Sequence, residues 1–213
     1  MQRPMKLAVF GGTGRTGHHL IQQALDAGHD VTAVVRDPAR LEIRHERLGV
    51  EQRNVFDPDA IAAVVDGADA VVTSLGKTSR QQPHVLRDGT RSIVAAMKAT
   101  GTRRLVAVSN SVHTAEAGDS AGRRLVQRLL RLPLRVPLAD VSDMEKEVEA
   151  SGLDWTILRP ARMKDGPRTG HYRLAVGEHV PGGWSIVRGD VADAILQVLD
   201  DERVIGTFVG QAT

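Results

Sequence analysis

Residues 6–17 read KLAVFGGTGRTG, and this stretch is the strongest indication of the fold class. It begins with a short apolar run that ends at a glycine cluster, as is typical of a buried strand. Within the cluster, Gly12, Gly14 and Gly17 have the spacing Gly-x-Gly-x-x-Gly. Residues 15–27 then carry apolar side chains at helical spacing, followed by a glycine that can end a helix. A strand, a glycine turn and a helix in this order predict the first unit of a parallel sheet.

Strands and helices alternate along most of the remaining sequence. Apolar runs predict further strands at residues 31–35, 50–55, 68–75, 105–109 and 155–158. Helical patterns occupy residues 60–65, 88–100, 140–150 and 191–199. This alternation predicts one α/β domain over residues 1–213, with a Rossmann-like, doubly wound parallel sheet and helices on both faces. We expect an inserted helical segment at about 115–138 and a small irregular C-terminal substrate lobe at about 160–187.

Composition excludes several classes of site. The chain of 213 residues contains no Cys, which excludes thiol nucleophiles, Cys-ligated zinc, iron–sulfur clusters and disulfides. Its formal net charge of +2 does not favour nucleic acid binding. There is neither a signal-peptide pattern nor an apolar run of about 18 residues, so we expect a cytoplasmic protein that does not bind membranes.

The glycine cluster predicts a dinucleotide site. A pyrophosphate can approach a helix N-terminus only where side chains are missing, and the helix N–H groups then stabilise its charge. The cluster follows a strand, opens a helix and is followed by a second strand, which is the context that this motif requires. His18 stands where a P-loop would have its phosphate-binding Lys, so a P-loop is disfavoured. A tight turn without a ligand is the alternative.

The end of the second strand predicts which dinucleotide is bound. An acidic residue there binds the ribose 2′-OH of NAD, whereas a cation pairs with the 2′-phosphate of NADP. Strand 31–35 is followed by Arg36, Arg40 stands four residues later, and we expect Arg15 to project toward the same ribose. These guanidinium groups predict NADPH. Asp37 leaves NADH open, because it could accept a hydrogen bond from the 2′-OH, and the arginines could also be solvated surface charges.

The usual proton donor of short-chain reductases is missing. These enzymes use Tyr-x-x-x-Lys, in which the Lys lowers the pKa of the phenol. The only tyrosine is Tyr172, and Val176 stands four residues later. In the predicted helix 140–150, Val141 and Glu145 occupy the corresponding places. No hydrolase elbow or metal-binding motif occurs either, so no metal site is predicted.

Three polar clusters follow predicted strands, where ligands bind in open α/β sheets. They are Ser74-Leu75-Gly76-Lys77, Ser109-Asn110-Ser111-Val112-His113 and Arg159-Pro160-Ala161-Arg162-Met163. Hydroxyl and amide groups there can bind the nicotinamide carboxamide, and Pro160 and Met163 can contact a flat ring. Turn capping explains Ser109 and Ser111 equally well.

Several segments together carry a resemblance over nearly the whole chain. They are FGGTGRTG at 10–17, VTAVVRD at 31–37, DGTRSIVAAMK at 88–98, SGLDWTILRP at 151–160 and GPRTGHY at 166–172. In these segments the chain resembles atypical short-chain dehydrogenases/reductases, within them the family of biliverdin IXβ reductase and NADPH-dependent flavin reductase. The resemblance implies a Rossmann fold and hydride transfer from NADPH to a flavin or a similar conjugated acceptor, such as an open tetrapyrrole or a quinone.

The resemblance also implies roles for individual residues. Arg36 and Arg40 would bind the 2′-phosphate, and Gly76 and Lys77 would lie beside the inner ribose. Together, motif and resemblance predict cofactor contacts at Gly11, Thr13, Gly14, Arg15, Thr16, Arg36, Arg40, Asn54, Val55, Ser74, Leu75, Gly76, Lys77, Ser109, Pro160 and Arg162. The predicted catalytic residues are Ser109, Ser111 and Arg162, and the predicted substrate contacts are Asn110, Val112, His113, Met163 and Trp184.

This sequence departs from the family pattern in three places, one of which is the character of the basic segment at residues 123–132. The family's Gly-Asp-Val on the adenine side reads Arg53-Asn54-Val55 here. The family's His on the substrate side is replaced by Arg162, which would suit an acidic acceptor such as a flavin phosphate or a propionate.

A basic amphipathic segment at residues 123–135 leaves a second function open. Its Arg residues recur at helical spacing beside a stripe of Leu, as in a flap that packs on the domain or in a surface that binds a protein partner. The alternative to a reductase is therefore a non-catalytic, NADP(H)-binding redox sensor that regulates a partner through this segment.

Overall fold

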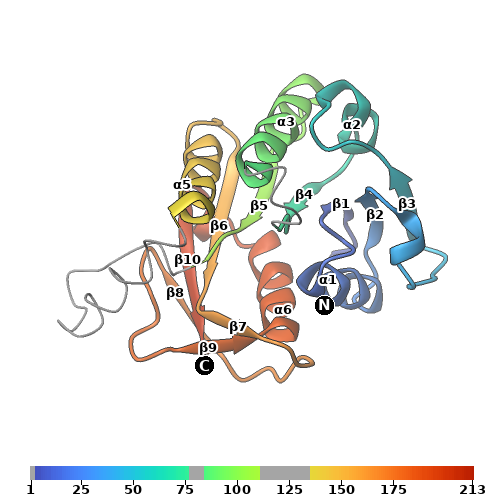
Figure 1. The fold of residues 1–213 in the computed structure, drawn as a ribbon. Helices are drawn as coiled ribbons and strands as arrows, with labels where there is room; N and C mark the ends of the chain where they lie inside the picture. Colours follow the sequence, from blue (N-terminus) through green and yellow to red (C-terminus); the bar gives the residue numbers. More distant parts are fainter. Residues whose placement is uncertain (1–2, 77–83, 111–134) are drawn as a thin grey trace.

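The computed structural model describes residues 3–76, 84–110 and 135–213, which form one α/β unit (Figure 1). Its strands are β1 (Lys6–Phe10), β2 (Asp30–Val35), β3 (Leu48–Gln52), β4 (Ala70–Thr73), β5 (Arg104–Val108), β6 (Asp154–Pro160), β7 (Arg162–Lys164), β8 (Arg173–Val176), β9 (Ser185–Val187) and β10 (Thr207–Ala212). Its α-helices are α1 (Arg15–Asp26), α2 (Pro58–Val65), α3 (Val85–Thr100), α5 (Arg135–Glu149) and α6 (Arg188–Leu199), with short 3-10 helices η1 (Pro38–Arg40) and η2 (Glu202–Val204).

Eight strands form the main sheet, in the order β3-β2-β1-β4-β5-β6-β10-β8. All neighbouring pairs are parallel except β10 and β8. From β1 the chain proceeds outward through β2 and β3 on one side of the sheet and then through β4, β5 and β6 on the other, so the strand order reverses between β1 and β4. Open α/β sheets bind ligands at the carboxyl ends of the strands beside such a reversal. The topology confirms the predicted Rossmann-like fold, apart from the antiparallel β8 at one edge.

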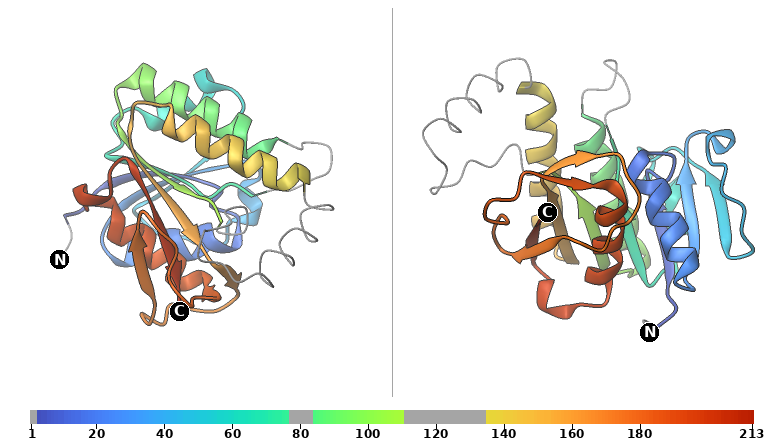
Figure 2. Two further views of the ribbon diagram at one scale, coloured as in Figure 1. Left: turned by 90° about the vertical axis from the view of Figure 1, so that its left-hand side faces the viewer. Right: turned by 90° about the horizontal axis from the view of Figure 1, so that it is seen from below.

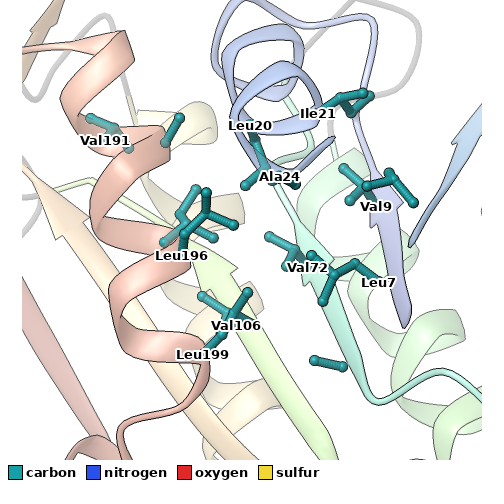
Figure 3. Packing of buried hydrophobic residues seen from close by; sticks show 14 of the residues in the cluster. Leu7, Val9, Leu20, Ile21, Ala24, Val72, Val106, Val191, Leu196 and Leu199 are labelled. Atoms are coloured by element: carbon teal, nitrogen blue, oxygen red, sulfur yellow. The ribbon is translucent and has the colours of Figure 1, made fainter. Parts of the chain in front are cut away.

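Helices cover both faces of the sheet, α1 and α6 on one and α2, α3 and α5 on the other (Figure 2). Strand β1 shows why two layers are needed: Leu7 and Val9 pack toward α1 and α6, while Ala8 and Phe10 pack toward the opposite layer. Leu20, Ala24 and other side chains of α1 meet those of α6 over the sheet (Figure 3). Removing a fully buried Leu from such a layer typically costs about 2–5 kcal/mol.

The C-terminal part of the fold corrects the sequence prediction. Strand β10 was not predicted, because Gly210 and Gln211 interrupt its apolar run. The lobe at 160–187 is not simply irregular, since it contains β8 of the main sheet and the separate pair β7 and β9. Most of the predicted insertion at 115–138 lies outside the described residues, and its last residues belong to α5. Among the described helices, none is both long and apolar enough to span a bilayer.

Candidate nucleotide site

The glycine turn leaves the N-terminus of α1 open to a ligand. Gly14 is the N-cap and has no side chain to bond to the first-turn amides, and that turn carries no acidic residue. Gly11 has a φ of +87°, a conformation that favours glycine, and its carbonyl oxygen accepts a hydrogen bond from Gly14 N at 2.9 Å. A Cβ at Gly17 would lie 2.3 Å from the Gly11 carbonyl oxygen. The turn therefore requires glycine at positions 11 and 17, and it suits a pyrophosphate.

A cavity of about 700 Å³ extends from this turn along the carboxyl ends of β1, β2, β4 and β5. It brings together most of the predicted site residues: Gly11, Thr13, Gly14, Arg15, Thr16, Arg36, Arg40, Val55, Ser74, Leu75, Gly76, Ser109, Asn110 and Met163. A glycine cradle joined to a cavity of this size fits a dinucleotide.

Four predicted site residues do not line the cavity. Strand β7 alternates, with Met163 half-buried and Arg162 exposed, so the two side chains leave opposite faces of the strand. Pro160 is buried in β6, and the side chain of Trp184 is 70% exposed. Asn54 lies beside the cavity, where its Oδ1 accepts a hydrogen bond from Phe56 N at 3.2 Å.

Four other predicted residues, Lys77, Ser111, Val112 and His113, lie outside the described residues, as does the basic segment up to residue 134.

Arg15 does not point toward the ribose end of the cavity as predicted. Its Nη1 donates to Asp165 Oδ2 at 2.9 Å, and the Nη1 of Arg188 donates to Asp165 Oδ1 at 2.7 Å. Asp165 directly follows β7, and both arginines line the cavity. One carboxylate of the C-terminal lobe thus holds two guanidinium groups beside the glycine turn.

Asp37 is engaged in the backbone of η1. Its Oδ1 accepts a hydrogen bond from Ala39 N at 3.1 Å, which makes it the N-cap of this short helix, and it is not among the cavity-lining residues. Arg36 and Arg40 both line the cavity, and within the described residues neither forms a salt bridge. The charge at this end of the cavity is therefore positive.

The structure adds lining residues that the sequence analysis missed. They are Arg53, Arg188, Asp140 and a largely apolar wall of Phe56, Val85, Leu86, Leu138 and Val141. Arg53 directly follows β3 but lies inside the strand predicted at residues 50–55, so its position at a strand end is not evident from the sequence. Asp140 is 1% exposed and accepts hydrogen bonds from Leu86 N and Arg87 N at 3.1 and 3.0 Å. It caps α3 from α5, a contact that no local pattern reveals.

The sole tyrosine is occupied outside the cavity. Tyr172 donates its hydroxyl proton to Asp193 Oδ2 at 2.6 Å, and it is not a lining residue. Burial, and next the hydrogen bond to Asp193, raise the pKa of the Tyr172 phenol above its ordinary value. Tyr172 therefore stays protonated and is not placed to donate to a substrate.

Helix α5 presents no phenol–lysine pair to the cavity. Val141 lines it, while the buried Glu145 accepts two hydrogen bonds from Arg159, at 2.9 and 2.8 Å. The Arg159 guanidinium lies 3.8 Å from the centroid of the Phe208 ring. Glu145 and Arg159 satisfy each other in the core, which is a structural role.

Ser109 brings an available hydroxyl to the cavity wall. It is 6% exposed, its backbone N donates to Leu158 O at 2.8 Å, and its Oγ has no hydrogen-bond partner in the described part of the chain. Buried hydroxyl groups are normally bonded, so an unbonded one at a cavity wall is consistent with a missing ligand. Within those residues the Oγ caps no turn, and the rest of the predicted cluster, residues 111–113, lies outside the described residues.

Comparison with known proteins agrees with this geometry. The chain is 30% identical over 208 residues to the Arabidopsis thaliana chloroplastic protein At2g34460, covering 93% of this chain and 73% of the relative. It is 29% identical over 184 residues to a 3-diazoavenalumate denitrifying reductase of a Streptomyces species, covering 79% of this chain and 59% of the reductase. The structure of a candidate NADH-flavin reductase from Streptococcus pneumoniae aligns with a TM-score of 0.80 at 22% identity, covering 98% of this chain and 99% of that one.

A family model described as NAD(P)H-binding matches residues 11–202, from the glycine turn to the start of η2. The match includes the ends of β2, β4 and β5, which contribute to the cavity. The chain therefore belongs to the NAD(P)H-binding oxidoreductase family.

Proposed function

We propose that this protein is an NADPH-dependent reductase that transfers hydride to a flavin or to a similar flat conjugated acceptor, such as a biliverdin-like tetrapyrrole or a quinone. The proposal rests on the composition of one cavity. The cavity contains the glycine turn, with Arg36 and Arg40 at one end and an apolar wall at the other. The only tyrosine, Tyr172, is hydrogen-bonded to Asp193 outside this cavity.

The lining residues suit the parts of NADPH in order. The glycine turn would hold the pyrophosphate, and Arg36 and Arg40 would face the 2′-phosphate. The free Oγ of Ser109 and the neighbouring Asn110 lie on the β5 side, where they can bond to the carboxamide. NADPH bound in this way would supply the hydride, and the protein would orient the cofactor and provide an apolar wall beside it.

The apolar wall determines which acceptors fit. Leu138, Val141 and Met163 offer flat aliphatic and thioether contact rather than polar groups. A simple ketone needs a proton donor at its oxygen as hydride arrives, and the cavity places no phenol there. A conjugated acceptor delocalises the incoming electron pair, so it can take its proton from water after hydride arrives. The balance is NADPH, acceptor and one proton giving NADP⁺ and the two-electron-reduced acceptor.

Two of the compared proteins are compatible with this proposal. One is named as a 3-diazoavenalumate denitrifying reductase, and the fold is shared with a candidate NADH-flavin reductase. The second likeness supports the fold, while the preference for NADPH rests on Arg36, Arg40 and the engaged Asp37.

An acceptor panel tests the proposal. NADPH oxidation is followed with FMN, FAD, riboflavin, biliverdin and menadione, and with cyclohexanone as a simple ketone. We expect steady oxidation with one or more conjugated acceptors and none with cyclohexanone. Gly17→Val serves as the control, because its side chain would collide with the Gly11 carbonyl oxygen and close the cradle. Lack of turnover across the panel by protein that binds NADP⁺ would contradict a reductase and favour the sensor alternative.

A further inference from the structure

Three arginines line the β2–β3 end of the cavity. Arg36 directly follows β2, Arg40 ends η1 and Arg53 directly follows β3, and all three line the same cavity. Strands β2 and β3 are parallel neighbours, so their carboxyl ends lie at the same edge of the sheet. The sequence analysis assigns a role to Arg36 and Arg40 only. Arg53 is therefore a further cation at this end of the cavity.

Backbone contacts fix Arg53 beside Arg36. The backbone N of Arg53 donates to Val35 O at 3.2 Å, one residue before Arg36. Gln52 Nε2 donates to the carbonyl oxygen of Arg36 at 3.0 Å. These two bonds tie the residues after β3 to the end of β2, so the spacing between the two arginines is set by the sheet and not by a separate loop.

The Arg53 side chain is oriented but keeps donors available. Its Nη1 donates to Gln52 O at 3.1 Å, and its Nη2 pairs with Glu51 Oε2 at 2.8 Å. A guanidinium has five N–H donors, so two contacts leave others for a ligand. The two side chains of this pair are 42% and 41% exposed, and an exposed pair of this kind contributes little and yields readily to a stronger anion.

The balance of charge favours a dianion at this end of the cavity. Three Arg side chains line it, and Glu51 is the carboxylate paired with one of them. Asp37 is nearby in sequence, but its Oδ1 is bonded to Ala39 N. A phosphate monoester carries close to two negative charges and three acceptor oxygens, and each of the three guanidinium groups can donate to it.

We infer that Arg53 is a third ligand of the 2′-phosphate and a specificity-determining residue for NADPH over NADH. The inference rests on the proposed use of NADPH at this site. In the competing explanation, Arg53 is a solvated surface residue that serves only to pair with Glu51. If Arg53 binds the 2′-phosphate, loss of its guanidinium weakens the binding of NADP⁺ only. If it serves only to pair with Glu51, the binding of both nucleotides is unchanged.

Binding of NADP⁺ and NAD⁺ by calorimetry, to the full chain, separates these explanations without requiring turnover. We expect Arg53→Gln to weaken NADP⁺ about tenfold, the effect of one lost charge-assisted contact, and to change NAD⁺ less than twofold. Arg53→Lys, which keeps the charge but not the fork, should fall between the two. Glu51→Gln should leave NADP⁺ binding equal or tighter. Arg203→Gln, with a side chain 90% exposed, is the matched surface control.

The same series distinguishes failure of this inference from failure of the proposed function. If Arg53→Gln changes NADP⁺ and NAD⁺ equally or not at all, while Arg36→Gln is selective for NADP⁺, the inference is wrong and the proposed use of NADPH stands. If the unaltered chain binds both nucleotides equally, both are wrong. Thermal unfolding of each variant shows whether the fold is retained. Binding of 2′-AMP, compared with binding of 5′-AMP, repeats the test with fragments that differ only in the position of the phosphate.

Discussion

Two groups of arginines line the cavity, and they differ in whether carboxylates of the protein already pair with them. At the β2–β3 end, Arg36 and Arg40 form no salt bridge within the described residues, and Arg53 pairs with a half-exposed Glu51. Beside the glycine turn, Arg15 and Arg188 share Asp165 of the C-terminal lobe. The first group is ready for an external anion, whereas the second is partly neutralised by the protein. We therefore expect selectivity between NADP⁺ and NAD⁺ to depend on the first group and general affinity for both nucleotides to depend on the second.

Removal of Arg36 is expected to have the largest effect. Arg36→Gln should weaken NADP⁺ about a hundredfold, because its guanidinium can make two charge-assisted bonds to the 2′-phosphate, while NAD⁺ binding changes little. Calorimetric titration of both nucleotides checks this. A comparable loss for NAD⁺ would show that the two arginine groups do not divide their roles.

Removal of Arg188 should act on both nucleotides alike. Its side chain is 12% exposed and lines the cavity beside the turn that would hold the pyrophosphate, which NADP⁺ and NAD⁺ share. Arg188→Gln is therefore expected to weaken each by about tenfold. The ratio of the two dissociation constants is the measurement, and a change in that ratio would contradict the assignment.

Removal of Asp165 should have a smaller effect in the opposite direction. Asp165→Asn frees both Arg15 and Arg188 for the nucleotide, so we expect the two dissociation constants to fall by roughly threefold. Glu51→Asn at the other end should affect NADP⁺ only. Weaker binding in Asp165→Asn would mean that the carboxylate positions the arginines and does not compete with the ligand.

The smallest effect is expected at Tyr172. Tyr172→Phe should leave the rate of acceptor reduction unchanged, because the phenol is bonded to Asp193 and does not line the cavity. It should change the pH dependence of stability. The folded protein raises the pKa of this phenol, so its contribution is present below the unfolded value of about 10 and is lost as pH rises above it. Chemical unfolding at pH 8 and pH 11 should show a smaller loss in Tyr172→Phe than in the unaltered chain.

How much of the site could be predicted from the sequence depends on whether a residue is placed by a local pattern or by a contact distant in sequence. Gly14, Arg36 and Ser109 belong to local patterns, a glycine turn and the ends of predicted strands, so the sequence predicts them at one edge of the sheet, and all three line the cavity. The ion pair of Arg15 is not predicted because its partner, Asp165, is 150 residues away in the sequence. Arg162 was misplaced because the alternation of a short, unpredicted strand decides which side chain faces inward. Asp140 depends on the packing of α5 against α3, which sequence spacing does not encode.

Anaerobic mixing of the protein with NADPH and FMN tests the central claim most directly. We expect NADPH to be oxidised and FMN to be reduced in a one-to-one ratio, at the same rate in Tyr172→Phe and at a much lower rate in Arg36→Gln when NADPH is below saturation. If no reduced flavin forms although NADPH is bound, or if Tyr172→Phe abolishes the reaction, hydride transfer without a phenol donor is wrong.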